Sequence, residues 1–195
     1  MKRREFITLL GGAAAAWPLA ARAQQSAMPV IGLLGSTSPA AWAPYLMAFR
    51  QGLREAGYVE GQNVTIEYRW AGSDYARLPT LAADLVRQHV AVIVAVGGSA
   101  SASAAKAATT TLPIVFSTGG DPVTLGLVTS LNRPGGNATG VSVLLAEMEG
   151  KRLGLLRDMV PTAHLIAVLL NPHSPVSASE LKIRDQPQDR EDARP

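Results

Sequence analysis

Three short segments rich in glycine and hydroxyl groups are the parts of this sequence best suited to holding a small polar molecule. They are Gly35-Ser36-Thr37-Ser38, Gly97-Gly98-Ser99 and Ser117-Thr118-Gly119-Gly120-Asp121. Each ends a short apolar run and precedes a predicted helix, where free backbone N–H groups and the helix dipole attract a carboxylate or another anion. Together they predict a hydrogen-bonding cradle. Taken singly, each segment is equally typical of a plain turn with an N-capping serine.

Asp121 is the acidic residue of this set, and the sequence leaves three roles open for it. It can cap the segment that follows, orient the cradle, or pair with an amine of the ligand. Trp42, just after the first segment, could cover a ligand, whereas Tyr45 is spaced with Phe49 and Leu53 at i, i+4 and i+8 and is predicted to be core.

The residue combinations that catalysis or metal binding requires are missing from the sequence. It contains no G-x-S-x-G, no G-x-G-x-x-G, no Walker lysine and no cysteine. His89, His164 and His173 lie apart without metal-ligand spacing and are interpreted as surface residues. We therefore expect no catalytic residue, no metal site and no cofactor.

Alternating apolar runs and amphipathic stretches predict a parallel sheet with crossover helices, the pattern of an α/β doubly wound fold. Strands are predicted at 28–35, 63–70, 90–96, 112–116 and 139–143, with helices at 40–56, from 74 onward, at 99–108 and in a short stretch ending at 131. Residues 63–70 alternate in polarity, which favours a half-exposed edge strand. The three hydroxyl-rich segments then follow carboxyl ends of strands, where open parallel sheets bind ligands. We assign this lobe to residues 28–145.

Residues 1–23 are typical of a removable signal peptide. Arg3 and Arg4 precede a small-apolar run at 9–16, and Ala21-Arg22-Ala23 matches a peptidase site, so a twin-arginine leader and export to the periplasm are predicted. An amphipathic N-terminal helix is the alternative, but the run has no polar face. The leader accounts for the whole net charge of +3. Because the remainder is neutral, no nucleic-acid partner is expected.

The C-terminal part changes character along its length. Residues 147–159 are predicted as a helix and 165–170 as a sixth strand, so 146–181 is interpreted as a hinge and the start of a second lobe. The segment 182–195 holds eight charged residues and is predicted to be a disordered tail.

An ordered series of motifs supports a family resemblance. It includes R-R-E-F-I, P-V-I-G-L-L-G-S-T-S-P, N-V-T-I-E-Y-R-W-A, V-G-G-S-A-S, P-I-V-F-S-T-G-G-D-P-V and I-A-V-L-L-N-P. From residue 1 to about 181, the chain resembles ABC-transporter substrate-binding proteins of the tryptophan/tyrosine type, which have the type I periplasmic binding fold. The resemblance implies two lobes that close over a small solute and dock on an inner-membrane permease. It implies first-lobe ligand contacts from Ser36, Thr37 and Ser38, from Gly98 and Ser99, and from Ser117 through Asp121, and it adds Asn171 from the second lobe.

The sequence departs from that family after about residue 179, where a truncated second lobe is expected. The leading interpretation is a periplasmic, non-catalytic solute-binding component of an ABC importer, exported by the twin-arginine or the general secretion machinery. A non-functional fragment and an exported ligand-sensing domain of the same fold remain alternatives. An exported α/β hydrolase is disfavoured because no nucleophile, base and orienting residue can be assembled.

Overall fold

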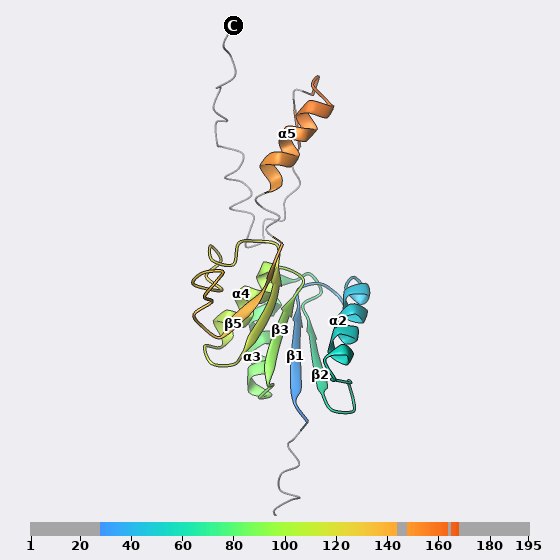
Figure 1. The fold of residues 1–195 in the computed structure, drawn as a ribbon, viewed down its shortest axis with the longest axis vertical. Coiled ribbons are helices and arrows are strands. Elements are labelled where there is room, and N and C mark those ends of the chain that lie inside the picture. The colour runs from blue at the N-terminus through green and yellow to red at the C-terminus, as the bar shows by residue number, and fades with distance from the viewer. Residues whose placement is uncertain (1–27, 144–147, 164, 168–195) are drawn as a thin grey trace, which may run out of the picture.

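The protein folds around one five-stranded parallel sheet (Figure 1). The computed structural model describes residues 28–143, 148–163 and 165–167. The strands are β1 (Val30–Gly35), β2 (Thr65–Trp70), β3 (Val92–Val96), β4 (Ile114–Thr118) and β5 (Ala138–Ser142). Their order is β2-β1-β3-β4-β5, and every neighbouring pair is parallel. The half-exposed segment predicted as an edge strand is indeed at one edge, as β2.

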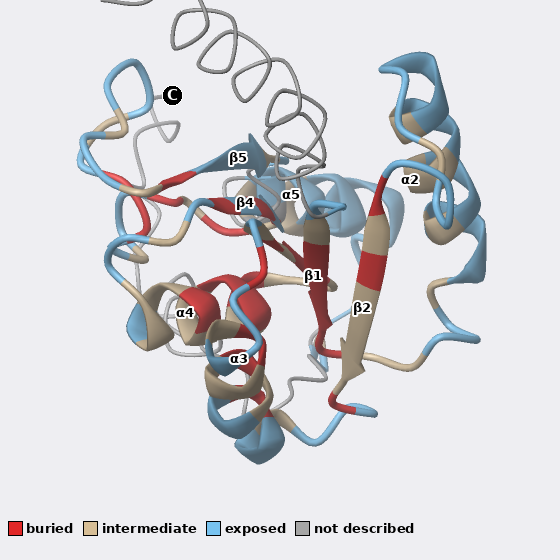
Figure 2. Ribbon diagram, turned by 90° about the horizontal axis from the view of Figure 1, so that it is seen from below, coloured by how far each residue is buried: buried red, intermediate tan, exposed pale blue. Residues whose placement is uncertain are grey.

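Helices cover both faces of the sheet, which confirms the predicted doubly wound α/β fold (Figures 1 and 2). They are α2 (Ala43–Glu55) on one face, and α3 (Leu78–Arg87) and α4 (Ser99–Ala108) on the other. A 3₁₀ turn, η1 (Tyr75–Arg77), leads into α3. Asp74 caps this turn by accepting a hydrogen bond from Ala76 N at 3.1 Å, and Pro79 lies in the first turn of α3.

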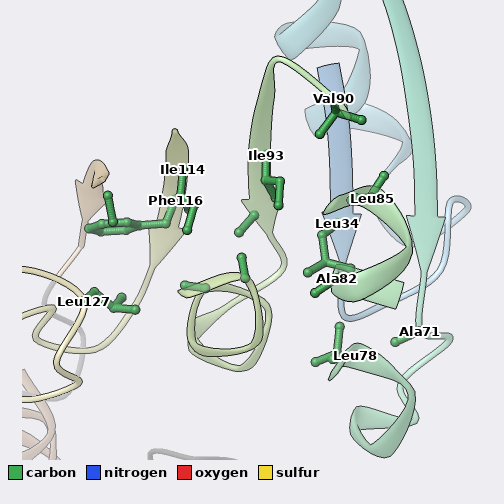
Figure 3. Packing of buried hydrophobic residues seen from close by; sticks show 14 of the residues in the cluster. Leu34, Ala71, Leu78, Ala82, Leu85, Val90, Ile93, Ile114, Phe116 and Leu127 are labelled. Atoms are coloured by element: carbon green, nitrogen blue, oxygen red, sulfur yellow. The ribbon is translucent and has the colours of Figure 1, made fainter. Parts of the chain in front are cut away.

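The face under α3 and α4 holds the larger core, here called the α3–α4 cluster (Figure 3). Leu34 of β1, Ile93 of β3 and Phe116 of β4 point into it, and the two helices add small residues that allow close packing. Its buried members are Leu34, Ala71, Leu78, Ala82, Leu85, Val90, Ile93, Ala95, Ala102, Ala105, Ile114, Phe116, Leu127, Val128 and Ala138.

The opposite face carries a smaller core, here called the α2 cluster. Its buried members are Ile31, Leu33, Val64, Ile66 and Val96. Helix α2 adds Leu46, Phe49 and Leu53, and Trp42 packs beside them just before it, but no residue from Ala43 to Glu55 is fully buried. The prediction that Tyr45 is core is wrong, because its side chain is 62% exposed. The residues of this segment that pack against the sheet are Trp42, Leu46, Phe49 and Leu53, so Leu46 takes the place predicted for Tyr45.

Two further predicted elements differ from the structure. The short helix expected before residue 131 is absent, since residues 122–126 form turns, and Leu127 and Val128 enter the α3–α4 cluster from this irregular connection. Residues 165–167, the described part of the predicted sixth strand, are not in a strand. Helix α5 (Glu149–Met159) occupies the predicted 147–159 helix and stands apart from the sheet (Figure 1).

The predicted leader at 1–23 and the tail at 182–195 lie outside the described residues, as does Asn171. Among the helices of the described part, none has the length and apolar character needed to cross a membrane.

Candidate ligand-binding site

The hydroxyl-rich segments converge at the carboxyl edge of the sheet. β1 and β3 are neighbours, but the chain leaves β1 towards β2 on one side and leaves β3 towards β4 on the other. This reversal makes the β1/β3 junction the switch point of the sheet, where a ligand finds space between diverging connections. The loop from Ser36 to Ser38 follows β1, and the Gly97-Gly98-Ser99 turn follows β3.

Ser36 joins these two loops. Its side chain is fully buried, and its Oγ donates to the carbonyl of Gly97 at 2.5 Å. A Cβ on Gly97 would stand 2.7 Å from that hydroxyl, so only glycine permits this approach, and its φ of +82° also favours glycine. Because the Ser36 hydroxyl proton is committed to Gly97, this residue shapes the cradle and can offer a ligand only acceptor capacity.

Ser99 and Thr118 join β4 to the start of α4. Their hydroxyls lie 2.6 Å apart, and both side chains are buried. Thr118 Oγ1 also accepts from Gly120 N at 3.2 Å, and Ser142 Oγ donates to the Gly120 carbonyl at 2.8 Å. Hydrogen bonds therefore connect the ends of β4 and β5 and the start of α4 along the carboxyl edge.

Thr37 differs from its neighbours, because its hydroxyl oxygen is buried without a hydrogen-bond partner. It is the one such buried side-chain atom in the part of the chain that the structure describes. Its backbone is held, since its carbonyl accepts from Gly72 N at 3.0 Å. Ser38 caps the next turn by accepting from Ala41 N at 3.3 Å. A buried hydroxyl without a protein partner is unusual, and it keeps its full capacity to donate to or accept from a ligand.

The N-terminus of α4 opens onto this edge. Its N-cap is Gly98, which supplies no side-chain hydrogen bond and adopts φ +116° and ψ −176°, a region essentially restricted to glycine. Apart from Gly98 and its two chain neighbours, no heavy atom of the described residues lies within 4 Å of where a Cβ on Gly98 would stand. The first N–H groups of this helix and its positive dipole end are thus available to an anion.

Asp121 organises the turn that follows β4. Its Oδ1 accepts from Val123 N at 2.9 Å and its Oδ2 from the Thr124 hydroxyl at 2.6 Å. These hydrogen bonds, the Thr124 one foremost, lower the pKa of Asp121 below its ordinary value. Of the three roles open for Asp121, capping matches these contacts, although the capped segment is a turn instead of a helix.

Ser117 is placed differently from the other predicted residues. It is exposed and alternates with buried Phe116 and Thr118, so it faces the side of the sheet that α2 covers elsewhere. The structure adds two contacts between loops that the sequence did not indicate. Gly97 fits against Ser36, and Ser73 takes a positive φ of +69° while its N–H donates to the Ser36 carbonyl at 2.8 Å. Both depend on contacts between distant loops.

A hollow of about 450 Å³ lies elsewhere, between the amino ends of β4 and β5. Asn137 in its wall already accepts from Lys106 Nζ and donates to the carbonyls of Thr109 and Leu112. The side-chain amide of Asn137 is therefore satisfied. The hollow shares no residue with the loops at the carboxyl edge of the sheet. Within the described residues, no group of three or more His, Asp or Glu side chains is placed to hold a metal.

A comparison with known families identifies the family of the chain. The family model described as ABC transporter substrate binding protein matches residues 23–188. The chain belongs to this family. Members of this family of substrate-binding proteins bind a small molecule and work with a membrane permease.

Individual relatives of this ABC transporter family extend the comparison. A tyrosine-binding protein of Clostridioides difficile (strain R20291) is 36% identical over 123 residues, which are 63% of this chain and 35% of the relative. The crystal structure of a conserved domain protein from Vibrio cholerae has a TM-score of 0.70 and 28% identity over 80% of this chain and 52% of that one. An ABC domain from Streptococcus pneumonia in complex with L-Trp has a TM-score of 0.63 and 26% identity over 78% and 50%.

These likenesses confirm the type I periplasmic binding fold that the motifs implied. The chain spans about half the length of the solved structures it resembles and about a third of the curated relative.

Proposed function

We propose that this chain is the solute-binding component of an ABC importer and that its solute is an amino acid, with an aromatic one favoured. The carboxylate of the amino acid binds at the N-terminus of α4, at the β1/β3 switch point. Support for the amino-acid class comes from the relatives, one described as a tyrosine-binding protein and another crystallised with L-Trp.

The observation that carries the proposal is the open space beside Gly98 at the start of α4, a helix that has no side-chain N-cap. A helix N-terminus next to a Gly-rich turn binds anions because its N–H groups and its dipole act together. The unpartnered Thr37 hydroxyl lies in the facing loop, after β1, and can donate to or accept from the same solute. Ser36, Ser99 and Thr118 hold the loops in place through their own hydrogen bonds.

The proposal also covers how the chain reaches the periplasm and hands its solute to a transporter. We propose export through the leader at 1–23, by the twin-arginine or the general secretion machinery, followed by docking on an inner-membrane permease. Contacts from a second lobe, beginning with Asn171 in the 146–181 segment, would stabilise a closed state with the solute enclosed.

Isothermal titration calorimetry of the full chain with L-tyrosine, L-tryptophan and L-alanine tests the proposal. We expect L-tyrosine or L-tryptophan to bind and to raise the thermal unfolding midpoint, by an amount that grows with the logarithm of ligand concentration above Kd. Gly98→Ala should weaken binding about tenfold or more, because it places a methyl group at the start of α4 and strains the backbone.

Gly57→Ala is the matched control. Gly57 also has a positive φ, +85°, with open space where a Cβ would stand, but it follows the carboxyl end of α2, away from the start of α4. Its variant should lose stability without losing affinity. The proposal fails if no amino acid binds, or if Gly98→Ala and Gly57→Ala leave the affinity equally unchanged.

A further inference from the structure

Three aromatic side chains gather beside the Ser36–Ser38 loop. Trp42 lies just before α2, and its ring centroid is 5.2 Å from that of Tyr45 and 6.3 Å from that of Trp70, the last residue of β2. The backbone ties this group to the loop, since Trp42 N donates to the Ser38 carbonyl at 3.2 Å. The aromatic group therefore adjoins the segment that also carries the unpartnered Thr37 hydroxyl.

The last residue of β1 explains where the Trp70 ring lies. Gly35 is the register partner of Trp70, and a Cβ on Gly35 would run into the six-membered part of the indole. The ring therefore occupies the space that a side chain at position 35 would fill. It covers the end of β1 directly before the Ser36–Ser38 loop.

Trp42 and Trp70 pack against the α2 cluster, but part of the aromatic surface stays exposed. Trp42 and Trp70 are only partly buried, and Tyr45, outside the apolar stripe of α2, is mostly exposed. Partly exposed aromatic faces and unpartnered polar groups at the same edge of the sheet combine the two features of a small-molecule site, an apolar wall and a few directed hydrogen bonds. The polar groups here are the α4 N-terminus and the Thr37 hydroxyl.

We propose that Trp42 and Trp70 are specificity-determining residues, whose indole rings form the wall against which the non-polar side chain of the bound amino acid packs. This inference rests on the proposed function, because it assumes that the carboxylate is held at α4. A packed aromatic contact contributes enough to change Kd by about 2- to 12-fold. The wall thus favours aromatic over small side chains.

The test compares L-phenylalanine with L-alanine on the full chain by calorimetry. Trp42→Leu and Trp70→Leu should each weaken L-phenylalanine binding by about 2- to 12-fold and leave L-alanine binding unchanged. Trp70→Phe keeps a ring and should keep most of the preference. Tyr58→Leu is the matched control, since Tyr58 is also an exposed aromatic but follows the opposite end of α2.

Tryptophan fluorescence supplies a second readout that a purely structural role would not move. The chain has three tryptophans, so a Trp17→Phe background leaves only Trp42 and Trp70 as emitters. L-phenylalanine, which is not excited with indole, should shift their emission at saturation, whereas L-alanine should not. If Trp70→Leu does not fold, Trp42→Leu, Trp70→Phe and this emission change decide the outcome.

The possible failures are distinguishable. Equal weakening of both amino acids in the tryptophan variants would overturn the inference and leave the proposed function standing. So would equal affinity of the unaltered chain for L-phenylalanine and L-alanine. If no amino acid binds the unaltered chain, the proposed function fails, and the inference fails with it.

Discussion

The α3–α4 cluster and the α2 cluster cover opposite faces of the same sheet, but among the described residues the first has 15 buried members and the second has five. Two helices and the connection between β4 and β5 close the first face. One helix without a fully buried residue covers part of the second. On that face Val141 and Val143, at and just beyond the end of β5, are 66% and 61% exposed.

Under the proposed binding mode, this asymmetry separates stability from recognition within one sheet. Apolar burial is the main favourable term in folding, so most of the free energy of unfolding should come from the α3–α4 face. The α2 face buries fewer residues, and at the carboxyl edge of the sheet it carries the aromatic group of Trp42, Tyr45 and Trp70. A partly exposed layer of this kind can take a ligand without first breaking a well-packed core.

A pair of leucine truncations should expose the difference most clearly. Leu85 of α3 is fully buried, so Leu85→Ala should lower the free energy of unfolding by about 2–5 kcal/mol. Leu46 of α2 is only partly buried, so Leu46→Ala should cost about 1 kcal/mol. Urea denaturation followed by circular dichroism measures both. Equal losses would show that the two faces contribute alike.

A pair of glycine substitutions should have the next largest effect. A Cβ on Gly140 would collide with the backbone carbonyl and the ring of Phe116 on the neighbouring strand, so Gly140→Ala should cost about 1–3 kcal/mol through overpacking. The three atoms nearest to a Cβ on Gly35 all belong to the Trp70 side chain, which can swing outward. We therefore expect Gly35→Ala to cost less and to change the near-ultraviolet circular dichroism of the indoles. A larger cost for Gly35→Ala would mean that the α2 face is the more rigid one.

The sequence predicts the sheet well because its signals are local. Continuous apolar runs identify central strands, and the alternation from Val64 to Trp70 identifies the edge strand β2. Parallel strands bring their carboxyl ends together, so the approach of the Ser36, Gly98–Ser99 and Thr118 segments follows from the strand pattern alone.

What the sequence could not supply depends on contacts between distant residues. Nothing in the Ser36-Thr37-Ser38 run shows that Ser36 bonds Gly97, that Thr37 stays unpartnered and that Ser38 caps a turn. The spacing favours a core position for Tyr45 because two apolar stripes overlap on α2, and only packing against β1 and β2 selects the one through Leu46. Asp121 precedes a plausible helix, but Pro122 and Gly126 instead accompany turns.

The same substitution, Thr→Val, at two positions compares a hydroxyl that has hydrogen-bond partners, that of Thr118, with one that has none among the described residues, that of Thr37. Thr118 bonds Ser99 and Gly120, so Thr118→Val should lower the free energy of unfolding by about 1 kcal/mol. The hydroxyl of Thr37 has no partner among the described residues, so Thr37→Val should be neutral or slightly stabilising without solute. The same variant should weaken amino-acid binding in calorimetry. A destabilised Thr37→Val chain with unchanged affinity would contradict a ligand-facing hydroxyl.

The smallest expected effect is a difference in how the two sides respond to pH. On the α3 side, Arg69 Nε lies 2.7 Å from Asp84 Oδ2, and this hydrogen bond lowers the pKa of Asp84. The unfolded chain therefore binds the proton more readily, and the stabilisation is lost as pH falls below about 4. On the α2 side, burial foremost, and then the hydrogen bond to Glu60, raise the pKa of Tyr68. That stabilisation is present below about pH 10 and lost as pH rises beyond it.

Urea denaturation across the pH range, with single variants, assigns each limb of the stability curve. Asp84→Asn should flatten the acid limb and leave the alkaline limb unchanged, because it removes the titrating group on the α3 side only. Tyr68→Phe should do the reverse, although it also removes the hydrogen bonds of Tyr68 with Arg50 and Glu60, at 2.9 and 3.0 Å. If both variants flatten the same limb, the two faces do not titrate independently, and the separation between a stabilising and a recognising side is weaker than their packing indicates.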